Sequence, residues 1–178
     1  MTSVKNISKT AASPARAQAV SPPVAVNDHL TEAIELLFFG YRDFISDPDA
    51  ILSAFEFGRA HHRVVHFVGR HPGITVAELL DILRITKQSL ARVLRQLIER
   101  RFVEQKTGEK DRRQRRLYLT PEGAELLRRL VAPQRDRVRK ALDAAGPGAE
   151  DAWRKVMLAL LNEENRPEVE HLITRDGK

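Results

Sequence analysis

The chain has 178 residues, of which 42% are hydrophobic and 30% are charged, a length and composition that fit one compact domain. It contains no cysteine, which excludes disulfides, thiolate metal sites, cysteine nucleophiles and thiol redox chemistry. The absence of cysteine is also compatible with a location in the reducing cytoplasm. The formal net charge is +6, and residues 86–116 alone carry eleven Lys or Arg against four Asp or Glu, which predicts a local cationic surface suited to a polyanion such as duplex DNA.

Residues 1–26 are rich in Ala, Ser, Pro and Val and lack the apolar segment of a signal peptide, which predicts a disordered arm. A first helix is predicted up to about residue 46, because apolar residues recur at helical spacing from Leu30 to Ile45. Asp47-Pro48-Asp49 should end it, since proline lacks an amide donor and disfavours helix at the preceding residue. No apolar run reaches about 18 residues, so no membrane-spanning helix is predicted.

A second helix is predicted over about residues 51–70, and His71-Pro72-Gly73 should end it. Thr75 and Glu78 have the spacing of a capping box, in which each side chain accepts a hydrogen bond from the backbone amide of the other residue. This spacing predicts a short third helix over residues 76–83.

Only two residues separate that helix from the next, a basic amphipathic helix over residues 86–101 with Thr86 as its N-cap. Two helices that meet through so short a turn form a helix-turn-helix. Residues 102–106 and 115–119 alternate between apolar and polar side chains, which predicts a β-hairpin with its tip at residues 108–113.

Thr120 and Pro121 are typical of the N-cap and the first residue of a helix, which should run to about Ala145. A last amphipathic helix should carry the apolar residues between 153 and 161. The predicted fold is therefore mainly α with a small β wing.

Several motifs of the predicted helix-turn-helix and hairpin lie at a fixed spacing. They are Ser89-Leu90-Ala91-Arg92, Leu97, Phe102-Val103, Asp111-Arg112-Arg113, Thr120 and Gly123. On these residues the chain, from about Leu30 to Leu161, resembles the MarR family of winged helix-turn-helix transcription regulators, and residues 59–63 and 85–90 look like its PetP-type branch. Arg101 departs from the pattern, because the family usually has a small turn residue such as glycine at this place.

The resemblance implies a MarR-like domain over residues 27–164, with a winged helix-turn-helix at about 51–120, dimerisation helices at about 27–46 and 121–164, and a tail at 165–178. It implies a homodimeric repressor or activator of transcription that places two heads on successive major grooves of a pseudo-palindromic operator. The apolar stripes of the flanking helices have no evident partner in so small a head, which agrees with a two-fold dimer. Packing of these stripes within one monomer is the alternative.

The basic helix indicates where bases would be read. With Leu94 at the centre of the buried face, steps of about 100° per residue turn Gln88, Arg92 and Gln96 outward and leave Arg95 on the flank. Gln and Arg make bidentate contacts with adenine and guanine edges, so the outward residues are candidates for base readout. An ordinary solvated helix face is the alternative. On this helix the predicted DNA-binding residues are Thr86, Lys87, Gln88, Ser89, Arg92, Arg95 and Gln96.

The hairpin tip supplies a second set of cations. Arg112 and Arg113 suit the narrow, negative minor groove. In the family an Asp at the place of Asp111 pairs with a wing arginine, and capping of the hairpin turn by this carboxylate is the alternative. On the hairpin the predicted DNA-binding residues are Lys110, Asp111, Arg112, Arg113 and Arg115.

The resemblance also implies a small-molecule pocket between the dimerisation helices and the head, for an effector that is a small aromatic or amphipathic compound. The candidate effector-binding residues are Phe38, Tyr41, Phe57 and His61. A hydrogen-bonded core histidine is the alternative for His61, which falls on the apolar face of its helix. His62 and His66 have a spacing that suits metal ligands, but no third ligand is identifiable, and neither a metal site nor another cofactor is predicted.

No phosphate-binding loop, nucleophile motif or carboxylate pair indicates an enzyme. A non-specific architectural, nucleoid-type DNA-binding protein and a metal-responsive regulator are the alternative functions. A sequence-specific regulator should prefer one pseudo-palindrome over bulk DNA by about 10³ or more, whereas an architectural protein should not.

Overall fold

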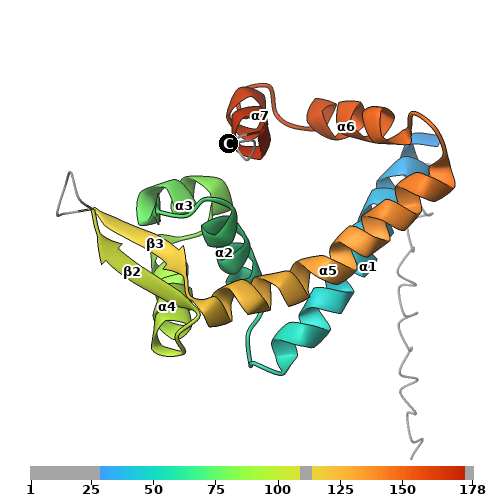
Figure 1. Ribbon diagram of the computed structural model, residues 1–178. Helices are drawn as coiled ribbons and strands as arrows, with labels where there is room; N and C mark the ends of the chain where they lie inside the picture. The colour runs from blue at the N-terminus through green and yellow to red at the C-terminus, as the bar shows by residue number, and fades with distance from the viewer. Residues whose placement is uncertain (1–28, 109–113, 175–178) are drawn as a thin grey trace, which may run out of the picture.

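The computed structural model describes residues 29–108 and 114–174, and helices make up most of it (Figure 1). In chain order the elements are α1 (His29–Ser53), α2 (Arg59–Arg70), β1 (Ile74–Thr75), α3 (Val76–Leu83), α4 (Lys87–Glu99), β2 (Val103–Thr107), β3 (Arg115–Leu119), α5 (Pro121–Ala145), α6 (Ala149–Ala159) and α7 (Arg166–Thr174). The predicted fold class, mainly α with a small β wing, is confirmed. None of the helices in the two described ranges is long and apolar enough to cross a membrane.

The elements form a head and an arm (Figure 1). The head contains α2, α3, α4 and the three strands, while the long helices α1 and α5 pack side by side and form the arm. Beyond the far end of the arm, α6 turns back toward the head, and α7 follows it within the segment predicted as a tail.

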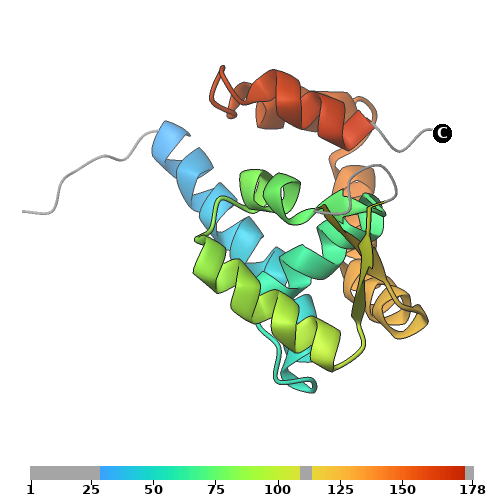
Figure 2. The same ribbon diagram turned by 90° about the vertical axis from the view of Figure 1, so that its left-hand side faces the viewer.

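Side-chain caps start the two helices of the helix-turn-helix where the sequence predicts them. Thr75 Oγ1 accepts a hydrogen bond from the Glu78 amide (3.2 Å), and the Glu78 carboxylate accepts one from the Thr75 amide (2.7 Å). Thr86 Oγ1 accepts a hydrogen bond from the Ser89 amide (3.2 Å) and caps α4. Between the helices Arg84 adopts a left-handed conformation with φ 48°, and the turn leads into α4, which lies at the surface of the head (Figure 2).

The core of the head lies between α2, α3, α4, the sheet and the first half of α5. Its fully buried members include Val64 and Val68 of α2, Leu79 of α3, Leu90 and Leu97 of α4, Leu117 of β3, and Leu126 and Leu130 of α5. Burial of one such leucine stabilises the folded state by about 2 kcal/mol. Because two leucines of α5 belong to this core, α5 begins as part of the head and leaves it as one continuous helix.

The strands form one antiparallel sheet in the order β1-β3-β2. Leu117 of β3 lies opposite Ile74 of β1, and Leu119 lies opposite Val103 of β2. The hairpin of β2 and β3 confirms the predicted wing, whereas β1 is too short for alternation to predict it. The predicted wing tip falls mainly on residues 109–113, which lie outside the described residues.

The boundary between the first two helices differs from the prediction. α1 continues through Pro48 to Ser53, and α2 begins only at Arg59, so the predicted helix end at residue 46 is wrong. Pro48 and Leu52 are fully buried, and we attribute the continued helix to this packing, which offsets the missing amide hydrogen bond. The chain turns instead at Glu56, which has a φ of 52°.

α5 begins against the turn that joins α4 to β2. In this turn Arg101 is left-handed, with a φ of 60°, and its carbonyl oxygen accepts a hydrogen bond from Thr120 Oγ1 (2.6 Å). A Cβ on Gly123 would lie 1.9 Å from the carbonyl oxygen of Phe102, so only glycine fits at this position of α5.

Replacing Arg101 with glycine is expected to raise the free energy of unfolding by about 1 kcal/mol, because glycine adopts positive φ without the steric cost of a Cβ. Arg101→Ala is the matched control, since it removes the same charge but keeps the Cβ, and it should give no comparable gain. Urea unfolding of the three proteins measures the difference. An equal gain in both variants would assign the effect to the side chain rather than to the backbone.

Candidate nucleic-acid interface

The exposed face of α4 is defined by the side chains that the head buries. The buried residues of α4 are Leu90, Val93, Leu94 and Leu97. Because Val93 is one of them, the centre of the buried face lies between Leu90 and Leu97 and not at the predicted residue. At about 100° per residue, Gln88, Arg92 and Arg95 then point outward, and Gln96 moves to a flank of the helix. Arg95 and Gln96 thus exchange the places that the sequence predicts for them.

The first turn of α4 presents further groups that suit phosphates. Lys87 is exposed at the first helical position, and the exposed Thr86 hydroxyl donates a hydrogen bond to Ser89 Oγ (2.9 Å). The unpaired amides at a helix N-terminus carry a partial positive charge that favours anions. The structure therefore leaves the predicted DNA-binding residues of α4 and its N-cap exposed at the surface of the head.

Gln96 is held by a histidine of the preceding helix. His61 of α2 is 9% exposed, and its Nε2 lies 2.7 Å from Gln96 Oε1. Its Nδ1 accepts a hydrogen bond from the Gly58 amide (3.1 Å), and its ring stacks on Phe57 with centroids 4.5 Å apart. Both ring nitrogens have partners, which agrees with the alternative of a hydrogen-bonded core histidine.

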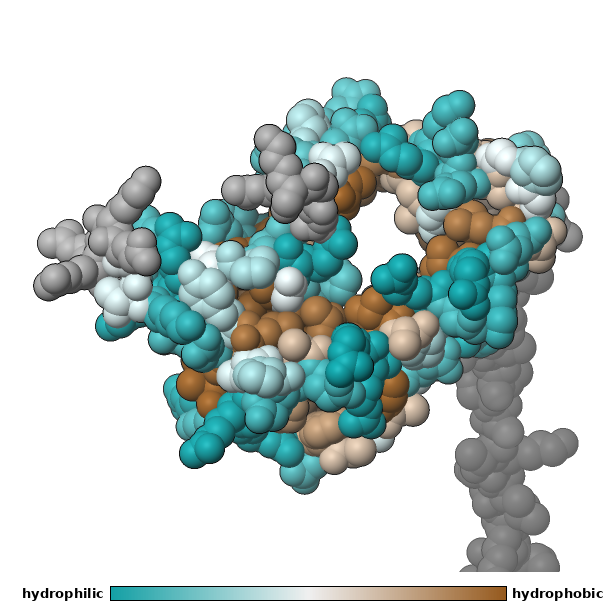
Figure 3. Space-filling view, in the orientation of Figure 1, coloured by the Kyte–Doolittle hydropathy of each residue, from teal (hydrophilic) through white to brown (hydrophobic). Residues whose placement is uncertain are grey.

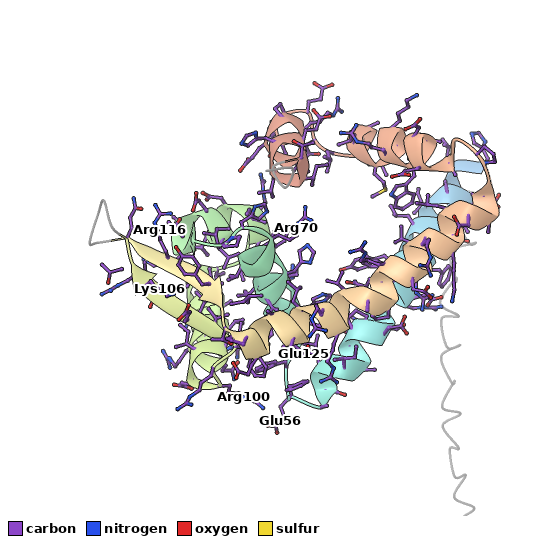
Figure 4. All side chains as sticks on the ribbon, viewed as in Figure 1. Glu56, Arg70, Arg100, Lys106, Arg116 and Glu125 are labelled. Atoms are coloured by element: carbon purple, nitrogen blue, oxygen red, sulfur yellow. The ribbon has the colours of Figure 1, made fainter. Side chains whose placement is uncertain are left out.

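The two consecutive arginines at the start of β3 lie in different surroundings. Arg116 is partly buried and donates a hydrogen bond to the carbonyl oxygen of Gly73 (3.2 Å), whereas Arg115 is exposed and donates one to Thr107 Oγ1 (3.0 Å). Lys106 of β2 forms an ion pair with Glu104 (2.7 Å), which raises the lysine's pKa (Figure 4). The predicted DNA-binding residues Lys110, Asp111, Arg112 and Arg113 lie outside the described residues.

The four candidate effector residues lie in two places. Phe57 and His61 contact each other in the head, whereas Phe38 and Tyr41 are 64% and 58% exposed on the arm half of α1. The described residues form a hollow of about 1190 Å³ elsewhere, between α2 and α5. Its lining includes His66, Arg70, Leu127, Val131 and Arg135. It lies between the head and a dimerisation helix, as the resemblance implies, but sequence reasoning named none of its lining residues, because they meet only through the packing of α2 on α5.

His62 and His66 lie on the same side of α2, with ring centroids 6.4 Å apart. Burial, together with the smaller effects of the neighbouring His62, Arg70 and His71, lowers the pKa of His66 to about 4. Burial also lowers the pKa of His62, against the smaller opposing effect of Asp49. Within residues 29–108 and 114–174, no three His, Asp or Glu residues converge into a group that could hold a metal ion.

Comparisons with known proteins agree with this geometry. The sequence model of the MarR family matches residues 56–114, which include the helix-turn-helix and the first strand of the wing. The HTH-type transcriptional regulator PetP of Rhodobacter capsulatus is 48% identical over 136 residues, which cover 76% of this chain and 82% of PetP.

Solved structures show the same fold. A crystal structure of MarR aligns with a TM-score of 0.59 and 25% identity, over 82% of this chain and 97% of MarR. Streptococcus pneumoniae FabT, crystallised in complex with DNA, aligns with a TM-score of 0.66 and 19% identity, over 74% of this chain and 94% of FabT.

The fold and the exposed basic helix define a winged helix-turn-helix transcription regulator. The chain belongs to the MarR family, and the predicted resemblance, including its PetP-type branch, is confirmed.

The depressed pKa of His66 makes stability depend on pH. The folded state binds fewer protons than the unfolded state between about pH 4 and the usual histidine pKa near 6.5, so the protein should lose stability as the pH falls through this window. His66→Gln should show a smaller loss between pH 7 and pH 5, measured by urea unfolding, while His29→Gln at the exposed start of α1 serves as control. An unchanged loss in His66→Gln would contradict the role of this residue.

Proposed function

We propose that this chain is a homodimeric, sequence-specific regulator that acts in the cytoplasm, with α4 in the major groove and the wing in the adjacent minor groove. The observation that carries the proposal is the outward face of α4, where Gln88, Arg92 and Arg95 are exposed on a helix whose opposite face is fixed in the core. Gln and Arg are the side chains that read adenine and guanine edges, and a fixed helix presents them in one orientation.

The wing supports the minor-groove part of the proposal through its charge. Arg115 is exposed at the start of β3, just after residues 109–113 in the chain. In that segment the sequence has Lys110, Arg112 and Arg113. Guanidinium groups are attracted to a narrow minor groove without reading individual bases. The wing arginines should therefore add affinity to every duplex, whereas α4 should supply sequence preference.

An apolar surface on the arm supports the homodimer. The arm half of α1 exposes Leu30, Ile34, Leu37, Phe38 and Tyr41, and α6 with its C-cap residue exposes Trp153, Val156 and Leu160. The space-filling view shows an opening through the molecule between α6–α7 and the head, with hydrophobic residues along parts of its edge (Figure 3). Exposed apolar patches of this extent indicate a protein interface, and a second copy related by two-fold symmetry is the commonest partner.

Substituting Ile34 and Phe38 together by aspartate is expected to shift the dimer toward monomer by at least about tenfold in dissociation constant, because two charges would enter an apolar interface. Ser46→Asp, which adds a charge on the exposed side of the same helix, should leave the dimer intact. Sedimentation at micromolar concentration measures both. A wild-type monomer, or a dimer in the doubly substituted protein, would refute the proposed interface.

Selection of genomic fragments by the purified protein, followed by footprinting, should yield one pseudo-palindrome whose half-sites lie about 34 to 36 Å apart. Gln88→Ala and Arg92→Ala should each cost about 1 to 3 kcal/mol at particular base pairs. Arg112→Ala and Arg113→Ala should weaken binding to all duplexes and lower the salt slope by about one for each lost phosphate contact. Titrations against the selected and a scrambled duplex measure these effects.

The same titrations decide between the two kinds of DNA-binding protein. A preference below about 10³ for the selected duplex would favour an architectural protein over a regulator. Wing variants that lose sequence preference, together with helix variants that lose affinity uniformly, would reverse the assignment of base readout.

The hollow between α2 and α5 supports control by a small effector. Its wall includes Leu127, Val131 and Ala132, and Arg70 (Figure 4) and Arg135 stand at the same hollow, so it suits an amphipathic compound with a negative charge. An effector that prefers the non-binding arrangement of the heads weakens operator binding, and the operator weakens effector binding by the same factor. Repeating the operator titrations with benzoate, on wild type and Arg135→Gln, tests this site.

A further inference from the structure

A chain of hydrogen bonds fixes which end of the Gln96 side-chain amide faces the protein. Gly58 is the N-cap of α2, and its amide donates to His61 Nδ1 (3.1 Å), so this nitrogen carries no hydrogen. The ring hydrogen is then on Nε2, which must donate. Its partner at 2.7 Å is therefore the acceptor end of Gln96, the carbonyl oxygen.

The histidine ring itself has little freedom to turn. It is 9% exposed and lies nearly parallel to the 7% exposed ring of Phe57, at an interplanar angle of 12°. Phe57 in turn packs edge-on against Phe102, with ring centroids 5.3 Å apart. The His61 ring is thus a fixed donor beneath an exposed glutamine of α4.

We infer that His61 is a positioning residue for DNA recognition, which holds the Gln96 amide so that it offers its NH₂ group, and not its oxygen, to the nucleic acid. The inference rests on the proposed function, in which α4 faces DNA. A free glutamine pairs with adenine by accepting from N6 and donating to N7. The bond from His61 takes one lone pair of the Gln96 oxygen and fixes the direction of the amide, so the NH₂ group is the end left without a partner. This group suits acceptors such as guanine O6 and N7, thymine O4 or a phosphate oxygen.

Gln88 provides the contrast on the same helix. It is exposed on the outward face, and its amide has no hydrogen-bond partner among the residues that the structure describes. Both ends of its amide are available to a base pair. The two glutamines of α4 should therefore have different base preferences, although their side chains are chemically identical.

Three variants test the inference on the operator selected above. His61→Phe keeps the stacking and most of the volume, and water can replace the lost partner of the amide of Gly58, a residue at the surface. Gln96→Glu keeps an acceptor for His61 but removes the NH₂ donors. Gln88→Glu is the matched control, a change of the same size at the free glutamine. Thermal melts of each variant report on folding.

Binding is measured on operators with each base pair replaced in turn. Gln96→Glu should lose about tenfold in affinity, the size of one good polar contact. His61→Phe should lose discrimination between bases at the operator position that Gln96 contacts, and it should tolerate adenine there. In a protein that already carries Gln96→Glu, His61→Phe should cause no further loss of this discrimination. Gln88→Glu should change preference at a different position and be insensitive to His61→Phe.

Modified DNA distinguishes the two sources of acceptor. If the cost of Gln96→Glu disappears on an operator with 7-deazapurines, the acceptor is a base. If it disappears on one with a methylphosphonate linkage, the acceptor is a phosphate, and His61→Phe should then lower affinity without changing base preference. Both results support the positioning role.

A folded His61→Phe protein with wild-type affinity and base preference would overturn the inference. A Gln96→Glu protein that binds the operator as tightly as wild type would also overturn it. This second test remains decisive even if the His61→Phe protein does not fold. Failure of the wild-type protein to select any operator is a different outcome, because it refutes the proposed function and the positioning role with it.

Discussion

The close contact between Gly123 and Phe102 is the constraint on which the rest of the molecule depends. A Cβ at residue 123 would lie 1.9 Å from the Phe102 carbonyl oxygen, so the backbone of α5 sits directly on the turn between the basic helix and the wing. Thr120 closes the same junction by its hydrogen bond to Arg101. Because α5 is continuous from this contact to the end of the arm, the arm sets the position of the wing and the basic helix. In the proposed dimer, the spacing of the two heads would follow from how the two arms pack.

Beside the same junction, aromatic rings hold the C-terminal end of α4. Phe55, Phe57 and Phe102 pack against one another, and the Arg100 guanidinium lies 4.7 Å from the ring of Phe57 while donating a hydrogen bond to the Phe55 carbonyl oxygen. A cation over an aromatic face contributes about 0.5 to 1 kcal/mol at exposed sites. The end of the basic helix is therefore held in place near the proposed DNA surface.

Local signals predicted the head well. The caps at Thr75 and Thr86 and the alternation of the wing strands each depend on a few neighbouring residues, and the structure contains them as expected. The failures came from packing between distant segments. Pro48 does not end α1, because burial in the core outweighs its local preference, and the partner of Gln96 is 35 residues away on another helix. The predicted DNA-binding residues of α4 are exposed at the surface of the head, but which of them has a free amide could not be read from helical spacing.

The passage of α1 through Pro48 without a break joins two different surfaces on one rigid rod. Its first half exposes apolar residues such as Phe38, and its last turns bury Pro48 and Leu52. Adding or deleting a single residue between these halves would rotate one surface against the other by about 100°, whereas an insertion of seven residues would leave only about 20° of rotation. The length of this helix is therefore restricted by helical phase, so that relatives of this architecture should vary there in steps of about seven residues, if at all.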